Sequence, residues 1–324
     1  MSDEPILTPP RLAVVIPTHE RNALIEGLLR ALASQTLPLS SFEVVLACDG
    51  CTDATAETAM QVVGPGGAAE GLMLTVVEQM RSGAAAARNR GMGATTAPIV
   101  VLFDDDMVPE PTCLEAHLRA HAAHPGALVL GHMPLHDRSP RSFLTEGLSR
   151  WAASRHTRLS HPGVVPEFGD VLTGHLSLAR STFGKVGGFD QDLNTGGKFG
   201  GEDIDFGYRA VEAGIPLVYA PDAVAGQIYI KSFRRLAKDI HEGTLAHAVL
   251  AVKHPEAPRE LPRGLAFGIG RRAPAVGRIL AVPLVALLDR AGRRGATGRD
   301  WEALHAVARN LISGIALSEA DSPG

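Results

Sequence analysis

The chain has 324 residues, of which 45% are hydrophobic and 20% charged, and its formal net charge is −4 at pH 7. This length can bury a core in one large domain or two smaller ones, and the composition is typical of a soluble globular protein. Residues 1–229 carry 16 basic and 26 acidic side chains, and residues 230–324 carry 15 and 9. An acidic body is therefore followed by a basic end suited to an anionic surface or substrate. The basic residues lack interleaved aromatic side chains, so nucleic acid is not an expected partner.

Cysteine content and hydropathy indicate the compartment. The three cysteines, Cys48, Cys51 and Cys113, are too few for a disulfide framework, which fits a reducing environment. The first residues lack the basic and apolar blocks of a signal peptide. The longest apolar run, 279–288, is half the length needed to span a bilayer. We expect a cytoplasmic protein, with peripheral contact to the inner face of the membrane left open.

The first 110 residues alternate strand and helix patterns. Short β-branched runs predict four strands, and apolar residues at helical spacing predict three helices between them. The strands are expected at 12–16, 44–47, 72–77 and 99–103, and the helices at 23–34, 53–63 and 84–94. This order predicts a mostly parallel, doubly wound α/β sheet, whose functional groups gather at the carboxyl ends of the strands.

The pattern weakens from 134 to 170, where we expect loops and one helix at about 142–153. Regular structure is expected to return at 169–179, and a helix at 202–213 follows a glycine-rich stretch. Further helices are expected at 232–254 and 299–317. The sequence thus predicts an α/β domain over 1–228 and a mainly helical, basic region over 229–324.

Three consecutive acids follow the fourth expected strand in "VLFDDDMVPEP", residues 101–111. Adjacent carboxylates repel one another, so Asp104, Asp105 and Asp106 need a source of positive charge. Oxygen ligands at a strand end suit Mg²⁺ or Mn²⁺, which often binds substrate phosphates as well. The alternative is a solvated acidic turn before Pro109.

Five segments, in this order, resemble a family 2 glycosyltransferase with the GT-A fold. They are "RLAVVIPTHERNALIEGLLRALASQT", "EVVLACDGCTDATAE", "GAAAARNRGMGATTAPIVVLFDDDMVPEP", "LTGHLSLARSTFGKVGGFDQDL" and "GGEDIDFGYRAVEAGIPLVYAPDA". The resemblance spans about residues 11–226. It implies an inverting, metal-dependent transfer of a sugar from a nucleotide sugar, with UDP-glucose or UDP-N-acetylglucosamine as candidate donors.

The resemblance assigns roles to matching residues. It implies nucleotide contacts for Pro17, Thr18, Glu20, Asp49, Arg88, Asp104 and Asp105, with Asp49 accepting a hydrogen bond from the base. Asp106, the last acid of the DxD pattern, is the implied ligand of the metal. Local readings remain for some of them: Asp49 can simply form the Asp-Gly turn, and Arg88 can ion-pair on a helix surface.

The pair Glu202 and Asp203 begins the helix after the glycines, where acids ordinarily complement the helix dipole. The resemblance instead places the general base here, and we expect Asp203 to be that base with Glu202 beside it. Gly174 and His175 are the implied contacts to donor sugar and acceptor, with a plain loop histidine as the alternative for His175. The glycine-rich loop that contains Lys198 and Phe199 is a candidate for closing over substrate.

The sequence departs from the family at one metal position. Gln227 stands where a histidine is often found, and an amide oxygen is a weaker ligand than imidazole for Mn²⁺, so we expect the metal to be held mainly by Asp106, diphosphate and water. Whether Gln227, His241 or His247 completes the site is left open, with ordinary helix-surface positions as the alternative for the two histidines. The acceptor stays open between a saccharide, a lipid-linked and a carrier-bound molecule, with O- or N-linkage undecided. The region 260–295 contains seven arginines and suits packing, a homodimer contact or a membrane surface.

Two other functions are compatible with parts of the chain. "VLFDDDMV" also fits the signature of haloacid dehalogenase-like phosphatases, whose first Asp is the nucleophile. That motif normally follows the first strand of its domain, whereas three strand-helix units precede it here. A degenerate transferase that binds nucleotide sugar without catalysis is the second alternative, suggested by Gln227 and the "CDGC" turn.

Overall fold

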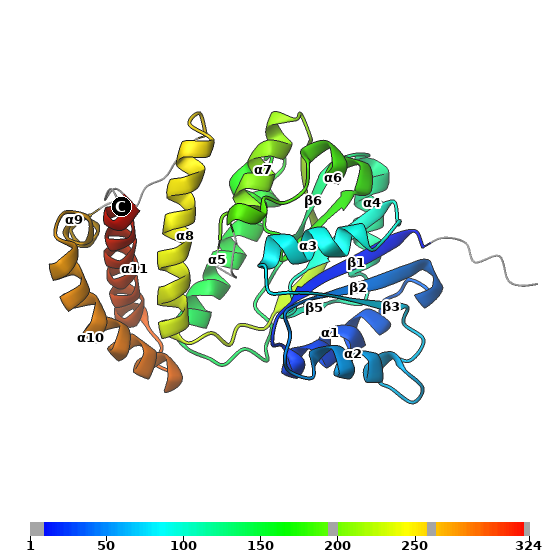
Figure 1. Ribbon diagram of the computed structural model, residues 1–324, viewed down its shortest axis with the longest axis horizontal. Helices are drawn as coiled ribbons and strands as arrows, with labels where there is room; N and C mark the ends of the chain where they lie inside the picture. Colours follow the sequence, from blue (N-terminus) through cyan, green and yellow to red (C-terminus); the bar gives the residue numbers. More distant parts are fainter. Residues whose placement is uncertain (1–9, 194–199, 258–263, 321–324) are drawn as a thin grey trace, which may run out of the picture.

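The computed structural model describes residues 10–193, 200–257 and 264–320 (Figure 1). Lys198 and Phe199 therefore lie outside the described residues. Eight strands form the sheet: β1 Leu12–Thr18, β2 Phe42–Asp49, β3 Leu74–Gln79, β4 Ile99–Phe103, β5 Met107–Pro109, β6 Leu128–His132, β7 His175–Ala179 and β8 Leu217–Gln227.

The strand order is β3-β2-β1-β4-β7-β6-β8-β5. Strands β3, β2, β1 and β4 run parallel, as expected from the alternating strands and helices. Strand β7 is antiparallel to both β4 and β6, and β5 is antiparallel to β8. The α/β prediction is confirmed, but the sheet is mixed. Strand β7 pairs with β4 in the antiparallel direction, and its first residue, His175, lies opposite Phe103 at the end of β4. The start of β7 therefore lies beside the acidic run that follows β4.

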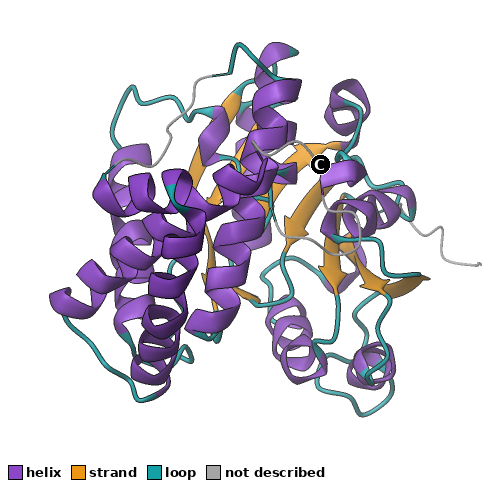
Figure 2. Cartoon of the chain, turned by 60° about the vertical axis from the view of Figure 1, so that its left-hand side comes forward, coloured by secondary structure: helices purple, strands orange, loops and turns teal. Residues whose placement is uncertain are grey.

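Helices cover both faces of the sheet (Figures 1 and 2). One face packs against α1 Asn22–Ala33, α2 Thr55–Val63 and α4 Cys113–Ala123. The other packs against α3 Ala84–Gly93, α6 Arg180–Val186 and α7 Glu202–Glu212. Neighbouring residues of a strand point to opposite faces of a sheet. Val14 and Val15 are neighbours in β1 and are both fully buried, so both faces of the sheet are covered. Continuous apolar strands are what a sheet covered on both sides requires.

A helical region follows β8 and occupies the left of Figure 1. It comprises α8 Phe233–Lys253, α9 Leu265–Arg272, α10 Pro274–Arg293 and α11 Arg299–Ala320. Helices α8, α10 and α11 pack on α5 Phe143–Leu159, which extends beyond the expected helix at 142–153, and α9 packs on α10 and α11. Phe143 of α5, Phe233 of α8 and Leu288 of α10 share one buried apolar cluster. Among the helices in the described ranges, none has the length and apolarity to cross a membrane.

Candidate active site

Three strand ends place the predicted site residues at one edge of the sheet. Thr18 is the last residue of β1, Asp49 is the last of β2, and the three acids follow β4 directly. These strands are parallel neighbours, so their carboxyl ends lie together. Helix α7 begins at the same edge. Glu202, in its first turn, forms an ion pair with Arg88 of α3, and Asp203 is the next residue.

Arg88 of α3 joins the two acidic segments. Its Nη2 lies 2.8 Å from Asp104 Oδ1 and its Nη1 lies 2.8 Å from Glu202 Oε1. The Arg88 side chain is only 4% exposed. Desolvation opposes its charge, but the carboxylates of Asp104 and Glu202 outweigh that effect and raise the pKa of Arg88. The local reading of Arg88 as a surface ion pair is wrong, since the pair is buried and links residues 114 positions apart.

Asp203 lies next to this ion pair without being part of it. Burial, followed by the neighbouring carboxylate of Glu202, raises the pKa of Asp203 to about 7. The guanidinium of Arg88 and the backbone N–H of Ile204, 2.8 Å from Asp203 Oδ1, act in the opposite direction. A carboxyl with a pKa near neutral can both accept and release a proton, which is the property a general base needs.

Asp105 is held by the last residue of β1 and by a residue of the turn after it. Thr18 Oγ1 donates to Asp105 Oδ2 at 2.8 Å, and Arg21 Nε lies 3.3 Å from Asp105 Oδ1. Burial raises the pKa of Asp105 to about 6, although Arg21 and Thr18 oppose the shift. Arg21 was not among the predicted residues. Its position directly after the "PTHE" turn was the available signal.

Asp106 lies beside Gln227 at the end of β8. The Gln227 amide nitrogen is 3.4 Å from Asp106 Oδ1 and 3.3 Å from Oδ2. Burial, followed by the charges of Asp104 and Asp105, raises the pKa of Asp106 to about 7. Lys231, which follows β8, opposes this shift from a distance and was also missed by the sequence analysis.

The two histidines proposed as substitutes for Gln227 differ in position. His241 of α8 pairs with Glu319 of α11 at 2.8 Å, so its ring is directed to the helical region. The prediction that it completes the metal site does not fit this contact. His247 is also on α8, where burial lowers its pKa. Gln227 is therefore the predicted residue that the structure brings to Asp106.

Asp49 organises the loop between β3 and α3. Its carboxylate accepts hydrogen bonds from Gln79 Nε2, Ser82 N and Gly83 N at 2.7–2.8 Å. An ionised carboxylate can accept about four hydrogen bonds, so one position remains for a base N–H. The three loop partners were missed, because nothing in the local sequence links them to Asp49.

Glu20 joins two loops at the same edge. Its Oε1 accepts hydrogen bonds from the backbone N–H and the hydroxyl of Thr52, both at 2.8 Å, which lowers the pKa of Glu20. Its φ is +54°, a conformation that non-glycine residues rarely adopt. Pro17, in β1, is fully inside the sheet, so its contribution is to the backbone rather than to an exposed contact.

Gly174 and His175 occupy different environments. Gly174 accepts a hydrogen bond from Asp104 N at 3.2 Å, and a Cβ at Gly174 would lie 3.0 Å from Asp104 Oδ2. Glycine thus allows the acid to approach the backbone of the next strand. His175 begins β7 and is 1% exposed, with its ring directed into the core. The expected contact of His175 with sugar does not fit this orientation.

The donor atoms at this edge suit a hard divalent cation. Carboxylate oxygens of the three consecutive acids and the amide oxygen of Gln227 are the ligand types that Mg²⁺ and Mn²⁺ prefer. Burial is the main cause of the raised pKa values of Asp105 and Asp106, and neighbouring carboxylates add to it, so a cation bound here would stabilise the ionised forms. The residues present therefore fit the predicted metal.

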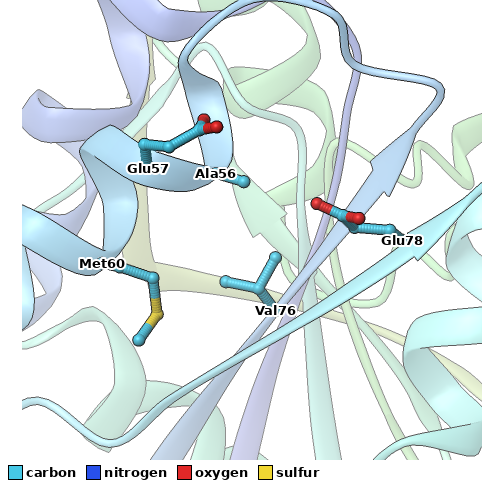
Figure 3. A pocket seen from close by; sticks show the side chains of 5 residues that line it. All are labelled: Ala56, Glu57, Met60, Val76 and Glu78. Carbon is cyan, nitrogen blue, oxygen red and sulfur yellow. The ribbon is translucent and has the colours of Figure 1, made fainter.

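An open hollow lies between α2 and the edge strand β3. Figure 3 shows its lining, with Glu57 and Glu78 above Met60 and Val76. None of the predicted site residues lines it.

Solved structures with a similar fold identify the class. The mannosyltransferase PcManGT from Pyrobaculum calidifontis, in complex with GDP-Man and Mn²⁺, aligns with a TM-score of 0.64 at 20% identity, covering 98% of this chain and 89% of that one. TarS 1–349 of S. aureus, in complex with UDP-GlcNAc, aligns with a TM-score of 0.58 at 15% identity, covering 96% and 90%. The fold is the GT-A fold, with a helical C-terminal region.

The sequence identifies the family. The profile described as "Glycosyltransferase like family 2" matches residues 9–249, and the chain belongs to this family. Validoxylamine A glucosyltransferase of Streptomyces hygroscopicus subsp. jinggangensis is 32% identical over 240 residues, covering 66% of this chain and 54% of that protein. Pre-mycofactocin glycosyltransferase of Mycobacterium tuberculosis is 30% identical over 220 residues, covering 61% and 43%. The chain thus spans about half the length of these curated relatives. Family membership also removes the phosphatase alternative.

Proposed function

We propose that the protein is an inverting, metal-dependent glycosyltransferase that moves a sugar from a UDP-sugar to an acceptor hydroxyl or amine. The observation that carries the proposal is the buried Arg88, which bridges Asp104 after β4 and Glu202 at the start of α7. This bridge ties together two acidic segments, one of which also contains Asp106 and the other Asp203, at one edge of the sheet. A phosphate-binding centre and a base are the two parts that such a transfer requires.

The nucleotide side is built by the ends of β1 and β2. Asp49 retains one hydrogen-bonding position beside Ser82 and Gly83, which suits the N3–H of uracil. Thr18 and Arg21 hold Asp105 in place. In this arrangement Asp104 and Asp105 face the ribose and the diphosphate, and Glu20, in the turn that follows Pro17 and the end of β1, borders the base.

A divalent cation bound by Asp106 would neutralise the negative charge that the departing diphosphate gains. Asp106 supplies a carboxylate, and the Gln227 amide can present its oxygen after rotation, since the two ends of an amide differ only in hydrogen bonding. Lys231 adds positive charge to the same group. Mg²⁺ or Mn²⁺ is the proposed cation.

The base is Asp203. An inverting transfer attacks the anomeric carbon in line with the leaving group, so one carboxylate removes the proton of the attacking hydroxyl or amine. The raised pKa keeps Asp203 ready to hold that proton, whereas Glu202 is engaged by Arg88. Glu202 is therefore the neighbour that tunes the base, and Gly174 is a close neighbour of Asp104 rather than of the acceptor.

The relatives guide the choice of donor. Validoxylamine A glucosyltransferase is named for glucose, and TarS was solved with UDP-GlcNAc and with UDP. UDP-glucose and UDP-N-acetylglucosamine are therefore the first donors to test. The acceptor is proposed as a saccharide, a lipid-linked or a carrier-bound molecule.

Incubation of the purified protein with a panel of UDP-sugars, with and without Mn²⁺, tests the proposal by mass spectrometry. The expected result is release of UDP and a mass increase of one hexose or N-acetylhexosamine on an acceptor, both dependent on the cation. Binding of UDP and Mn²⁺ without hydrolysis or transfer over a broad acceptor panel would instead support a degenerate, non-catalytic member of the family.

A further inference from the structure

A second polar cluster lies in the core between α4 and β7. Cys113, His117 and His121 are spaced by four residues and therefore share one face of α4. His175 and Ser177 are two residues apart on β7 and share one face of that strand. The helix face and the strand face meet, so five side chains with donor or acceptor atoms gather in the interior.

Burial makes this cluster unusual. Cys113 and His117 are 0% exposed, and His175 is 1% exposed. Polar groups placed in a core need partners, because each unsatisfied group costs free energy. A neutral imidazole keeps a free lone pair on one ring nitrogen, which is the form of histidine that binds metal ions.

The hydrogen bonds fix how the rings point. His175 Nδ1 lies 3.2 Å from the carbonyl oxygen of His132, which can only accept, so Nδ1 carries the proton. The Nε2 lone pair of His175 then faces His117 Nε2 at 2.8 Å and Cys113 Sγ at 3.5 Å. A second ring nitrogen that donates to a backbone carbonyl is the usual arrangement of a metal-binding histidine.

One lone pair on His175 Nε2 therefore faces two groups. His117 and Cys113 cannot both donate well to it, since a single in-plane lone pair accepts one strong hydrogen bond. A metal ion resolves the conflict, because it accepts a lone pair from each of the three atoms. Ser177 Oγ, 2.7 Å from His117 Nδ1, would then accept the proton of that ring nitrogen.

We propose that Cys113, His117 and His175 bind a thiophilic transition-metal ion, Zn²⁺ or Cu⁺, between α4 and β7. The three donor atoms lie within 4.8 Å of one another. Ligand bonds of about 2.0–2.1 Å to nitrogen and about 2.3 Å to sulfur bring donors to similar separations. The nitrogen–sulfur pair already fits at 3.5 Å, and the two imidazole nitrogens must separate slightly from 2.8 Å. Thiolate and imidazole ligands select these soft ions over Mg²⁺ or Mn²⁺.

Binding involves one proton. The Cys113 thiol gives up its proton to solvent as its sulfur bonds to the metal, because the thiolate is the form that ligates the ion. The bound ion would tie α4 to the first residue of β7. That residue follows Gly174, which contacts Asp104, so the ion stabilises the core directly beneath the acidic edge.

Metal analysis of the full chain tests the site. The protein is produced without a polyhistidine tag in medium supplied with Zn²⁺ or with Cu⁺, and its metal content is measured by mass spectrometry. A parallel sample receives Co²⁺, whose thiolate complexes absorb in the near ultraviolet. The expected result is one ion per folded chain and a thiolate-to-cobalt band. Comparison of the Zn²⁺ and Cu⁺ samples identifies the preferred ion.

Variants locate the ion. Cys113→Ser and His117→Gln should lower the affinity for the ion by at least about 10- to 100-fold, so that a metal chelator removes the ion from these variants at concentrations at which the wild type retains it. Cys51→Ser, at a half-buried cysteine elsewhere, and His121→Gln, on the same face of α4, should retain the ion. Circular dichroism confirms that each variant is folded. If the folded wild-type protein binds none of the three metals, or if Cys113→Ser and His117→Gln retain the ion, the proposal is overturned. The outcome does not depend on transfer activity.

Discussion

Burial shifts pKa values in opposite directions in two neighbouring regions. One is the acidic edge of the sheet, which contains Asp104 to Asp106 and Asp203, and the other is the histidine cluster in the core, which contains Cys113, His117 and His175. At the edge, burial raises the pKa of Asp106 and Asp203 to about 7. In the core, the same physical effect lowers the pKa of His175 to about 3. The carboxylate oxygens at the edge suit a hard cation, whereas the imidazoles and the thiol in the core suit a soft ion. Two adjacent sites can thus differ in metal chemistry without sharing a ligand.

Asp203→Asn is expected to have the largest effect. It removes the proposed base while retaining shape, so transfer should fall by about 10²- to 10⁴-fold. UDP affinity in the presence of Mn²⁺ should change little, because Asp203 is placed at the acceptor side. Transfer rates and calorimetric titration with UDP measure the two quantities. Glu212→Gln, on the exposed end of the same helix, is the matched control.

Loss of UDP binding in Asp203→Asn would contradict the division of roles along the acidic edge. So would a fall in transfer of equal size in Glu212→Gln.

Asp106→Asn should weaken binding of the divalent cation at the acidic edge. Even loss of an outer partner of a metal typically costs about 10- to 100-fold in affinity or activity, and Asp106 is proposed as a direct ligand. The Mn²⁺-dependent part of UDP binding should therefore fall by at least that factor, as measured by titration with and without Mn²⁺. Metal content at the histidine cluster should stay constant in this variant. Unchanged Mn²⁺-dependent binding would remove Asp106 from the site.

Arg88→Met should lower the free energy of unfolding, because it leaves the carboxylates of Asp104 and Glu202 without their shared partner. Removing one member of a buried ion pair costs about 3–5 kcal/mol, and the lower end applies because Asp104 is 38% exposed. Urea unfolding measures the change. Arg90→Met, exposed on the same helix, should change the free energy of unfolding by at most about 0.5 kcal/mol. Equal effects of the two substitutions would contradict a structural role for the Arg88 bridge.

Stability should depend on pH with opposite signs in the two regions. The pKa of Asp203 is raised in the folded state, so its contribution is present at acidic pH and lost as pH rises through about 7. The pKa of His175 is lowered, so its contribution is present above its ordinary value of 6.5 and lost as pH falls toward about 3. Unfolding without divalent cations, measured at several pH values, separates the two.

Comparing Asp203→Asn with the wild type isolates the contribution of Asp203 to this pH dependence of stability. The variant should be more stable than the wild type at pH 8, and the difference should vanish at acidic pH. A difference that is independent of pH would contradict the raised pKa of Asp203.

The sequence was informative where neighbouring residues carry the signal. Apolar runs and strand-helix alternation predicted β1 to β4, and the order of motifs predicted the GT-A fold. The antiparallel β7 was not foreseen as such, because strand direction depends on where a chain returns to the sheet rather than on local pattern. Asp106 and Asp203 could be selected from the sequence because each lies in a short local motif. Their roles are predictions.

Contacts between distant segments were not accessible from the sequence. Arg88 reads locally as a surface residue of an alanine-rich helix, and only the fold brings it between Asp104 and Glu202. The three partners of Asp49 come from the end of β3 and the loop after it. His175 was expected near sugar because its motif lies there, but the alternation of a strand directs its ring to the core while Gly174 stays beside Asp104.

A crystal structure of the protein with UDP and Mn²⁺ tests the central claim most directly. The account predicts the cation between Asp106 and the diphosphate, uracil beside Asp49, and open space next to Asp203 on the side where an acceptor attacks. A diphosphate bound away from Asp106, or a nucleotide that covers Asp203 and leaves no approach for an acceptor, would contradict it.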